Sequence, residues 1–370
     1  MKIVIAIDSL KGSLSSMEAG HAIEQGIRNV LPETKVLVKP LADGGEGTTE
    51  ALVEGLGGDM VQVQVHGPLE TPVNADYGVI RESNTAIMEM AAAAGIILVG
   101  KDKRPLDATT YGVGEMIRDA ITRGCREFII GIGGSATNDG GIGMLQALGF
   151  DLLDQEGVPV RHGALGLRDL AVISDSHVLP ELKECTFRIA CDVTNPLCGP
   201  QGCSAVFGPQ KGAASAMIQQ MDQWLSSYAA LAGKSFPETN PAHAGAGAAG
   251  GLGFAFLTFF HATLESGVNI ILEETHLSDY IKNADIVITG EGCLDGQTVM
   301  GKAPAGVAKI AKEFQKPVLA FSGCVTEDAK ACHAAGIDAF FPIVRGAVSL
   351  EEAMQTDHAK QNMTDTVEQV

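Results

Sequence analysis

Short apolar runs that alternate with amphipathic stretches dominate the N-terminal part of the chain. Residues Lys2–Ile7 (KIVIAI) are rich in β-branched side chains and predict a buried parallel strand that ends at Asp8. A helix is expected next, because Ser15 and Glu18 have the spacing of a capping box and apolar residues then recur with a helical period. Residues 35–39 (KVLVK) predict the second strand, so this part has the pattern of a βαβ unit.

The C-terminal part repeats this alternation. Further apolar runs predict strands at residues 285–289, 317–321 and 338–341. Pro304 suits the first turn of a helix that reaches about Phe314, and residues 331–335 indicate another helical segment. A short helix is expected at residues 349–354, and the last ten residues are expected to be frayed.

The middle of the chain has a different pattern. Its apolar runs alternate with polar residues between Pro and Gly turns, which predicts antiparallel or mixed strands. The runs lie at residues 61–65, 73–80, 85–90, 128–130, 150–153, 187–190 and 205–207, and residues 213–231 have a helical pattern. We therefore predict two α/β domains. Residues 1–60 and 281–370 form a doubly wound domain with about five parallel strands, and residues 61–280 form an inserted mixed α/β domain.

Composition narrows the classes of function. The chain has 370 residues and a net charge of -19. The electrostatic field of this charge repels the phosphate backbone of nucleic acids, so no nucleic-acid partner is expected. No apolar run approaches the roughly 18 residues of a membrane span. The eight cysteines contain no C-x-x-C pair, and the N-terminus has no signal-peptide pattern. We expect a cytoplasmic protein with reduced cysteines, and a homo-oligomer is compatible with the sequence.

The first of three glycine-rich loops, residues 131–141, follows the strand predicted at residues 128–130. It begins with the G-x-G-x-x-A pattern of dinucleotide-binding loops. The sequence Asn138-Asp139-Gly140-Gly141 then interrupts the helix that such a loop requires. A loop rich in Ser, Thr, Asn and Asp favours a polar ligand or a phosphate, and a plain strand-to-helix turn is the alternative.

The other two loops match known patterns only in part. Residues 245–253 have the letters G-x-G-x-x-G without a preceding strand, so close helix packing or a hinge is an equal alternative. Residues 296–303 are one residue short of a Walker A loop, because Ala303 stands where that loop has Ser or Thr. We therefore exclude a P-loop. Lys302, near a helix N-terminus, is a candidate phosphate contact, and a solvated lysine is the alternative.

Carboxylates in glycine-rich turns at the ends of predicted strands form another group of candidates. They lie at four places, which are Asp8, Asp43 with Glu46, Asp192, and Glu291 with Asp295. Phosphoryl transfer needs oxygen ligands for Mg²⁺, positive charge at the phosphates and a base near the acceptor hydroxyl. Each acid alone could instead cap a turn. The ligand-binding sites of α/β proteins form at the carboxyl ends of their strands, so the four places together favour a ligand-binding site there.

These motifs resemble the glycerate kinase family, which includes the bacterial glycerate 2-kinases, over essentially the whole chain. The segments that carry the resemblance are residues 8–13, 40–47, 133–141, 191–196, 206–212, 245–253 and 289–302. The resemblance implies phosphoryl transfer from ATP with Mg²⁺ to D-glycerate, with 2-phosphoglycerate favoured over 3-phosphoglycerate. It also implies a flavodoxin-like domain, an inserted restriction-endonuclease-like domain and a cleft between them. Cys293 is a departure, since many relatives are expected to have Arg there.

Candidate roles follow from the motifs and the resemblance. Asp192 is expected to accept the proton of the glycerate hydroxyl, supported by Asn195, and Lys11 is the third predicted catalytic residue. The candidate magnesium ligands are Glu291 and Asp295. The predicted contacts with substrate or nucleotide are Asp8, Ser13, Asp43, Gly44, Gly45, Gly134, Ser135, Thr137, Asn138, Asp139, Lys211, Glu291 and Lys302.

Two other functions stay open from the sequence. An NAD(P)-dependent oxidoreductase would use the loop of residues 131–141, although the interruption at Asn138 argues against it. A non-catalytic sugar-acid sensor would bind its ligand in the same cleft without turnover. The sequence contains no helix-turn-helix or other output module that would favour a sensor.

Overall fold

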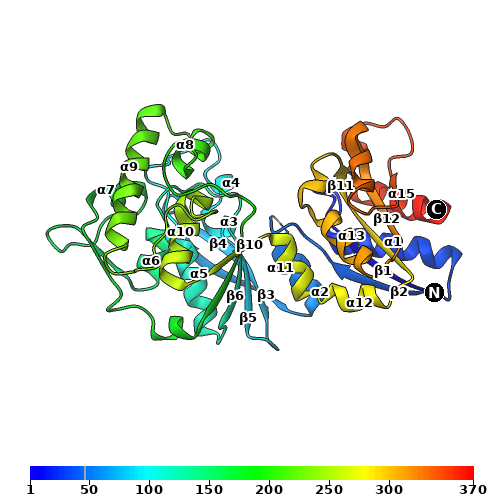
Figure 1. Cartoon of the computed structure of the whole chain (residues 1–370), viewed down its shortest axis with the longest axis horizontal. Coiled ribbons are helices and arrows are strands. Elements are labelled where there is room, and N and C mark those ends of the chain that lie inside the picture. The colour runs from blue at the N-terminus through cyan, green and yellow to red at the C-terminus, as the bar shows by residue number, and fades with distance from the viewer. Residues whose placement is uncertain (46) are drawn as a thin grey trace. The chain divides into compact units, whose positions relative to one another are not determined.

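The protein has a mixed α/β fold, seen in a computed structural model that describes residues 1–45 and 47–370 (Figure 1). The predicted α/β class is confirmed. The described residues divide into two compact units. The first unit contains Met1–Gly57 and Gly267–Val370, and the second contains Gly58–Ser266. Glu46, one of the candidate acids, lies outside the described residues.

A parallel sheet of five strands lies at the centre of the first unit, in the order β13-β12-β11-β1-β2. The strands are β1 (Lys2–Ile7), β2 (Lys35–Pro40), β11 (Ile286–Leu294), β12 (Val318–Val325) and β13 (Ala339–Pro342). Counted along the chain within this sheet, the order is 2-1-3-4-5, which is the flavodoxin-type doubly wound order. The direction of winding therefore reverses between β1 and β11, as the doubly wound prediction requires.

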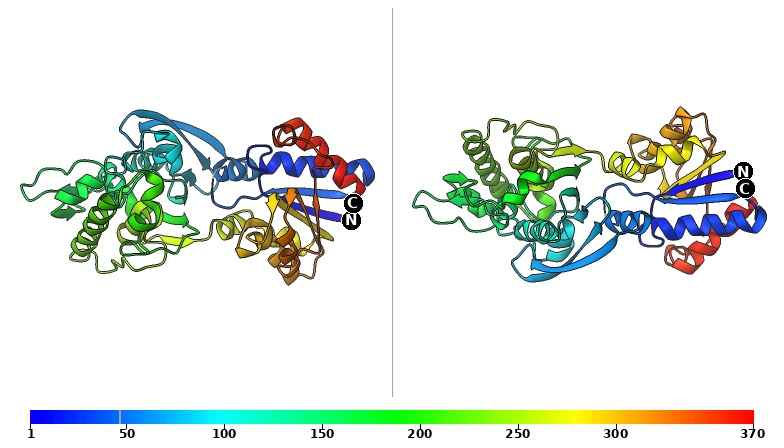
Figure 2. Two further views of the ribbon diagram at one scale, coloured as in Figure 1. Left: turned by 90° about the horizontal axis from the view of Figure 1, so that it is seen from above. Right: turned by 90° about the horizontal axis from the view of Figure 1, so that it is seen from below.

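Helices cover both faces of this sheet (Figure 2). On one face, α1 packs against β1, β2 and α15, and on the other face α13 packs against β11, β12 and β1. The helices of this unit are α1 (Ser16–Val30), α2 (Thr48–Leu56), α11 (Gly267–Glu274), α12 (Leu277–Lys282), α13 (Ala303–Glu313), α14 (Leu350–Ala353) and α15 (Thr356–Gln369). The 3-10 helices are η3 (Thr298–Met300) and η4 (Glu327–His333).

The start of α1 is fixed by the predicted capping box. The Ser15 hydroxyl accepts a hydrogen bond from the Glu18 amide at 3.1 Å, and the Glu18 carboxylate accepts one from the Ser15 amide at 2.9 Å. Such a reciprocal pair satisfies two amides that the first helical turn would otherwise leave unpaired. The cap therefore sets where the loop after β1 ends and how its residues face the carboxyl edge of the sheet.

Two predictions for the C-terminal segment are wrong. The last ten residues are not frayed, because they belong to α15, where Ala359, Met363 and Val367 are buried against α1. These apolar residues recur every four positions and form a narrow stripe along one face of the helix. Because the rest of the helix is polar, the stripe is hard to recognise in the sequence. The helical segment expected at residues 331–335 is instead the earlier 3-10 helix η4. The short helix predicted near residues 349–354 is confirmed as α14.

The second unit contains a mixed sheet of six strands in the order β10-β9-β6-β5-β4-β3. Its strands are β3 (Asp59–His66), β4 (Pro72–Ile80), β5 (Thr85–Glu89), β6 (Glu127–Gly131), β9 (Thr186–Ala190) and β10 (Thr263–Glu265). The β3–β4 and β4–β5 pairs are antiparallel, and the other pairs are parallel. The prediction of antiparallel or mixed strands is confirmed. A separate antiparallel pair joins β7 (Asp151–Leu153) and β8 (Val172–Ser174).

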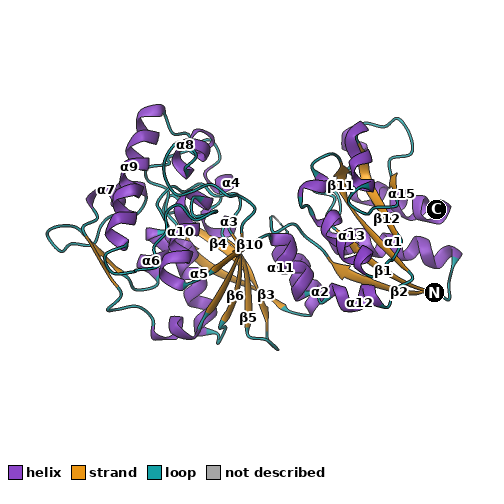
Figure 3. Cartoon of the chain, in the orientation of Figure 1, coloured by secondary structure: helices purple, strands orange, loops and turns teal. Residues whose placement is uncertain are grey.

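Helices surround the sheet of the second unit, as Figure 3 shows by colour. They are α3 (Ala91–Ala94), α4 (Ile96–Val99), α5 (Tyr111–Thr122), α6 (Ile142–Ala147), α7 (Ala164–Asp169), η1 (Pro180–Glu184), α8 (Cys203–Phe207), η2 (Pro209–Lys211), α9 (Ser215–Ala232) and α10 (Ala248–Phe260). The strand predicted at residues 205–207 is wrong, because these residues lie in α8. A three-residue apolar run has too few residues to separate the period of a strand from that of a helix.

Among the described residues, no helix combines the length and the apolar character that crossing a lipid bilayer requires.

Candidate functional site

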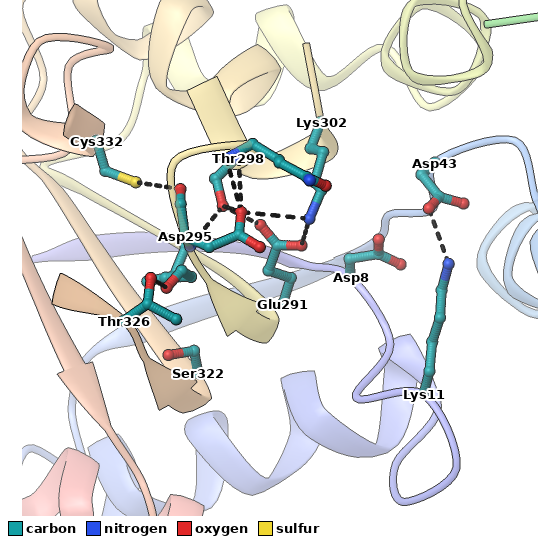
Figure 4. A network of polar contacts seen from close by, with 12 residues as sticks. Asp8, Lys11, Asp43, Glu291, Asp295, Thr298, Lys302, Ser322, Thr326 and Cys332 are labelled. Atoms are coloured by element: carbon teal, nitrogen blue, oxygen red, sulfur yellow. Dashed lines mark hydrogen bonds and ion pairs between the residues drawn. The ribbon is translucent and has the colours of Figure 1, made fainter. Parts of the chain in front are cut away.

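Charged side chains gather at the carboxyl edge of the first unit's sheet, where the winding reverses (Figure 4). Asp8 directly follows β1, and Glu291 lies in the neighbouring strand β11. A cavity of about 440 Å³ opens at this edge. Its polar lining residues are Asp8, Ser9, Lys11, Ser13, Asp43, Glu291, Asp295 and Lys302. Doubly wound proteins bind ligands in the crevice at such a reversal, so this cavity is the candidate functional site.

Asp8 is the most deeply buried acid on the β1 side of the cavity, with 5% of its surface exposed. Its Oδ1 accepts a hydrogen bond from the Ser9 amide at 2.7 Å. Burial, together with the negative charge of Asp43, raises the pKa of Asp8 to about 7. A carboxyl group with this pKa can both accept and release a proton near neutral pH.

The backbone of Asp8 is held by the neighbouring strand. Its amide donates to the Gly290 carbonyl at 2.9 Å. Gly290 itself approaches β12 so closely that a Cβ atom there would lie 1.8 Å from the Phe321 carbonyl oxygen. A side chain at this position would therefore push the strands apart, and a glycine keeps the Asp8 and Glu291 side chains close to the same edge.

Lys11 and Asp43 form an ion pair across the mouth of the cavity, with 2.9 Å between Nζ and Oδ2. Asp43 Oδ1 also accepts from the Gly45 amide at 2.9 Å. Burial favours the protonated acid, but the ammonium and the amide outweigh it and lower the pKa of Asp43. The Lys11 side chain is 61% exposed, so the pair contributes little stability and the ammonium can turn to an incoming anion.

A second cluster lies on the loop between β11 and α13. The Thr298 hydroxyl donates to Glu291 Oε1 at 2.6 Å, and Lys302 Nζ donates to Glu291 Oε2 at 3.2 Å. Lys302 also lies 3.6 Å from Asp295 Oδ1, which accepts hydrogen bonds from two amides of its own turn. Burial raises the pKa of Glu291 against the effect of Thr298 and Lys302. Lys302 thus stands between two acids at the N-terminus of α13.

The remaining predicted residues of this loop region line the same edge. Ser13 lines the cavity, and its buried hydroxyl has no hydrogen-bond partner among the described residues. Gly44 has a φ of +88°, a left-handed conformation that glycine adopts without strain, and the chain therefore turns directly after Asp43. Gly45 supplies the amide that binds the Asp43 carboxylate. The structure thus brings Asp8, Lys11, Ser13, Asp43, Gly44, Gly45, Glu291, Asp295 and Lys302 together in the first unit.

A separate polar cluster lies in the second unit, around the glycine-rich loop after β6. Lys211 is buried there, and its Nζ donates to the Ser135 hydroxyl at 2.8 Å and to the Thr137 carbonyl at 2.6 Å. Burial lowers the pKa of Lys211 to about 8. Asn138 donates to the Ser204 hydroxyl at 2.9 Å, while its Oδ1 and the Thr137 hydroxyl have no partner among the described residues.

Asp139 lies within the same cluster but makes internal bonds. Its carboxylate accepts from the Thr110 amide at 2.8 Å, from the Thr110 hydroxyl at 2.9 Å, and from the amides of Gly141 and Gly143 at 3.1 and 3.4 Å. These bonds tie the start of α6 to the segment before α5. Burial raises the pKa of Asp139. Gly134, by contrast, is exposed and has a φ of +71°.

The glycine-rich segment of residues 245–253 packs against this loop. The Gly140 amide donates to the Gly250 carbonyl at 2.9 Å, and Gly250 has a φ of +69°. A Cβ atom at Gly250 would lie 2.1 Å from the Thr137 carbonyl oxygen. The close approach of the two backbones therefore requires a glycine at position 250.

Asp192 and Asn195 lie in the second unit, on the loop after β9. Asp192 is exposed, and Asn195 is half-buried and donates to the Gln201 carbonyl at 2.9 Å. The structure therefore places the predicted proton acceptor in a different unit from Lys11. The catalytic roles of these residues stay predictions.

Several residues around the site are not among the sequence-based candidates. One is Thr298, whose hydroxyl donates the shortest hydrogen bond to Glu291. Its signal in the sequence is the Asp-x-x-Thr spacing from Asp295, which is typical of a capped turn. Apolar residues of α14 and α15 also line the cavity, and so does Met354 between these two helices.

Comparison with known proteins decides the family. The model of the glycerate kinase family matches residues 3–370. The chain belongs to the glycerate kinase family. The predicted family and the predicted kinase class are thereby confirmed.

Members of the glycerate kinase family resemble this chain along its whole length. A glycerate kinase of Bacillus subtilis is 48% identical, with 100% of this chain and 97% of the relative covered. A glycerate 2-kinase of Escherichia coli K12 is 47% identical, with 96% of this chain and 93% of the relative covered. A crystal structure assigned as glycerate kinase 2 of Salmonella typhimurium LT2 is 47% identical and has a TM-score of 0.92, with 100% and 96% coverage.

The environment of Asp8 leads to a test by titration. We expect the carboxyl ¹³C resonance of Asp8, assigned by its loss in Asp8→Asn, to titrate near pH 7. Because the pKa in the folded protein lies above that in the unfolded chain, Asp8 favours folding at low pH, and this contribution is lost as the pH rises to about 7. The window runs from about pH 4, the pKa of an aspartate in the unfolded chain, to about pH 7, the pKa of Asp8 in the folded protein. Across it, the free energy of unfolding of the wild type should fall relative to that of Asp8→Asn by up to about 1.4 kcal/mol per pH unit. A resonance that titrates near pH 4 would contradict the burial argument.

Proposed function

We propose that this protein transfers the γ-phosphoryl group of ATP to D-glycerate, and that the 2-hydroxyl is the favoured acceptor. The observation that carries the proposal is the cluster of carboxylates and lysines around the cavity where the sheet winding reverses, in a chain of the glycerate kinase family. The name of the E. coli relative, glycerate 2-kinase at 47% identity, supports the choice of the 2-hydroxyl.

Lys11 and Lys302 would supply the positive charge at the cavity. Both pair with carboxylates in the structure, but their side chains are 61% and 35% exposed. Phosphoryl transfer spreads negative charge over the oxygens of the transferred group, and fixed cations stabilise that charge. We infer that an anionic ligand draws these ammonium groups away from Asp43 and Glu291 and onto phosphate or glycerate carboxylate oxygens.

Glu291 in β11 and Asp295 directly after it fit a magnesium ion carried by the phosphates. Mg²⁺ prefers oxygen ligands and is commonly held by one or two carboxylates together with substrate phosphates. Among the described residues, no group of three or more His, Cys, Asp or Glu side chains is arranged to hold a metal ion. Glu291 and Asp295 would hold it. When bound, the ion would neutralise charge that develops on the phosphate oxygens.

Two carboxylates are proposed for the proton acceptor. Asp192 is the residue expected from the motif around it, and its loop also provides Asn195. Asp8 is a second proposal, because it lines the cavity and its raised pKa suits a base near neutral pH. The polar cluster around Lys211 in the second unit, with the open acceptor of Asn138, is proposed to contact substrate or nucleotide as well.

The direct test of the function is a product assay. We expect the full chain, incubated with Mg-ATP and D-glycerate, to give a ³¹P NMR signal of 2-phosphoglycerate that disappears when Mg²⁺ is chelated. A 3-phosphoglycerate signal would keep the kinase and contradict the position. Binding of glycerate without turnover would contradict the kinase and favour a sensor, and binding of NAD(P)H would favour an oxidoreductase.

A pair of isosteric variants decides between the two proton acceptors. We expect Asp8→Asn to lower kcat by about 100-fold or more, because a general base usually contributes at least that factor. We also expect kcat of the wild type to fall as the pH drops below about 7, where Asp8 takes up a proton. Asp192→Asn is the matched comparison. A loss of this size in Asp192→Asn, with less than about a tenfold loss in Asp8→Asn, would assign the role to Asp192 instead.

A further inference from the structure

Two cysteines lie side by side at the candidate site. Cys293 in β11 and Cys324 in β12 are direct partners in the parallel ladder, and both line the cavity. Register partners in a parallel pair project from the same face of the sheet, and neighbouring strands are about 4.8 Å apart. This spacing falls within the range of roughly 4.4–6.8 Å between Cα atoms that a disulfide can span. The backbone therefore already has the separation that a bond between these residues needs.

The two thiols also differ in access. Both are free, reduced thiols in the structure. Cys324 is exposed, whereas Cys293 is half-buried. Among the other cysteines, Cys125, Cys203 and Cys332 are buried. A small oxidant that enters the cavity thus meets an accessible thiol with a second thiol beside it.

We propose that Cys293 and Cys324 are a redox-sensitive dithiol that a peroxide converts to a disulfide, and that this disulfide inhibits the site. The effect on activity rests on the function proposed above, whereas the formation of the disulfide does not.

The chemistry balances with a peroxide as the oxidant. The Cys324 thiolate attacks one peroxide oxygen, the O–O bond breaks, and a sulfenic acid forms with release of water. The Cys293 sulfur then attacks the sulfenic sulfur, the S–O bond breaks, and the second water leaves as the disulfide forms. Two thiols are oxidised and one peroxide is reduced to two waters. Cys324 is exposed and Cys293 is half-buried, so Cys324 meets the oxidant first and Cys293 acts second.

The position of the pair explains why a disulfide would inhibit. Cys293 lies two residues after Glu291 and two residues before Asp295. A covalent bond to β12 would therefore fix the segment that carries both candidate magnesium ligands. The bond would also bring the two sulfur atoms closer together in the wall of the cavity. The segment from Glu291 to Asp295 could then no longer shift when a ligand enters.

The test uses the full chain and a readout that is independent of activity. We expect hydrogen peroxide to produce a cross-linked Cys293–Cys324 peptide under non-reducing mass spectrometry, lighter than the separate peptides by two hydrogen atoms. Most of the glycerate kinase activity should be lost in parallel and should return with dithiothreitol. Cys324→Ser and Cys293→Ser should form no such cross-link and keep the activity that each has before treatment. Cys185→Ser, in the second unit, is the matched control and should respond like the wild type.

Several results would overturn the proposal. One is the absence of the cross-linked peptide from the oxidised native protein. Another is a loss of activity in Cys324→Ser as large as in the wild type. A protein that forms the cross-link but never shows kinase activity would contradict the proposed function while leaving the dithiol in place.

Discussion

The parallel pairing of β1 with β11 is the constraint on which the site depends. This pairing matches Ile3, Val4 and Ile5 with Ile286, Val287 and Ile288, so the first strand of the chain lies beside a strand from near its other end. Because parallel strands end at the same edge, Asp8 and Glu291 are carried to one place by buried apolar residues that have no chemistry of their own. The hydrogen bond from the Asp8 amide to the Gly290 carbonyl extends this pairing into the site. The winding reverses at this pair, and the cavity opens there.

Both lysines of the site are paired with carboxylates of the site. Lys11 neutralises Asp43, and Lys302 stands between Glu291 and Asp295, so the cations are already in place but are bound to internal partners. The net charge of -19 therefore says little about the local field that an anionic ligand meets. The ion pairs are partly exposed and weak, which lowers the cost of exchanging a carboxylate for a phosphate. Lys11 pairs with Asp43 rather than with Asp8, and the burial of Asp8 together with the charge of Asp43 outweighs the effect of Lys11 and raises the pKa of Asp8.

The sequence predicted the parts of the structure that are encoded locally. The apolar runs predicted the strands of the first unit. Of the acids selected because they follow predicted strands, Asp8, Asp43, Glu291 and Asp295 line the cavity, whereas Asp192 lies in the second unit. The contact of Thr298 with Glu291 could not be predicted, because it depends on how the loop from Asp295 folds back on β11. Residues 205–207 are too few to show a period, and the stripe that includes Met363 is too sparse to identify a packed helix. In each case, contacts distant in the sequence decided the outcome.

If the carboxyl edge of the first unit's sheet binds the phosphoryl group, ligands should protect the backbone of that edge. We would measure hydrogen exchange of the full chain with and without D-glycerate and a non-hydrolysable ATP analogue with Mg²⁺. We expect slower exchange of backbone amides in residues 8–14 and 291–302 when the ligands are bound. Unchanged exchange in both segments, with protection confined to residues 131–141 or 204–212 of the second unit, would contradict binding at that edge.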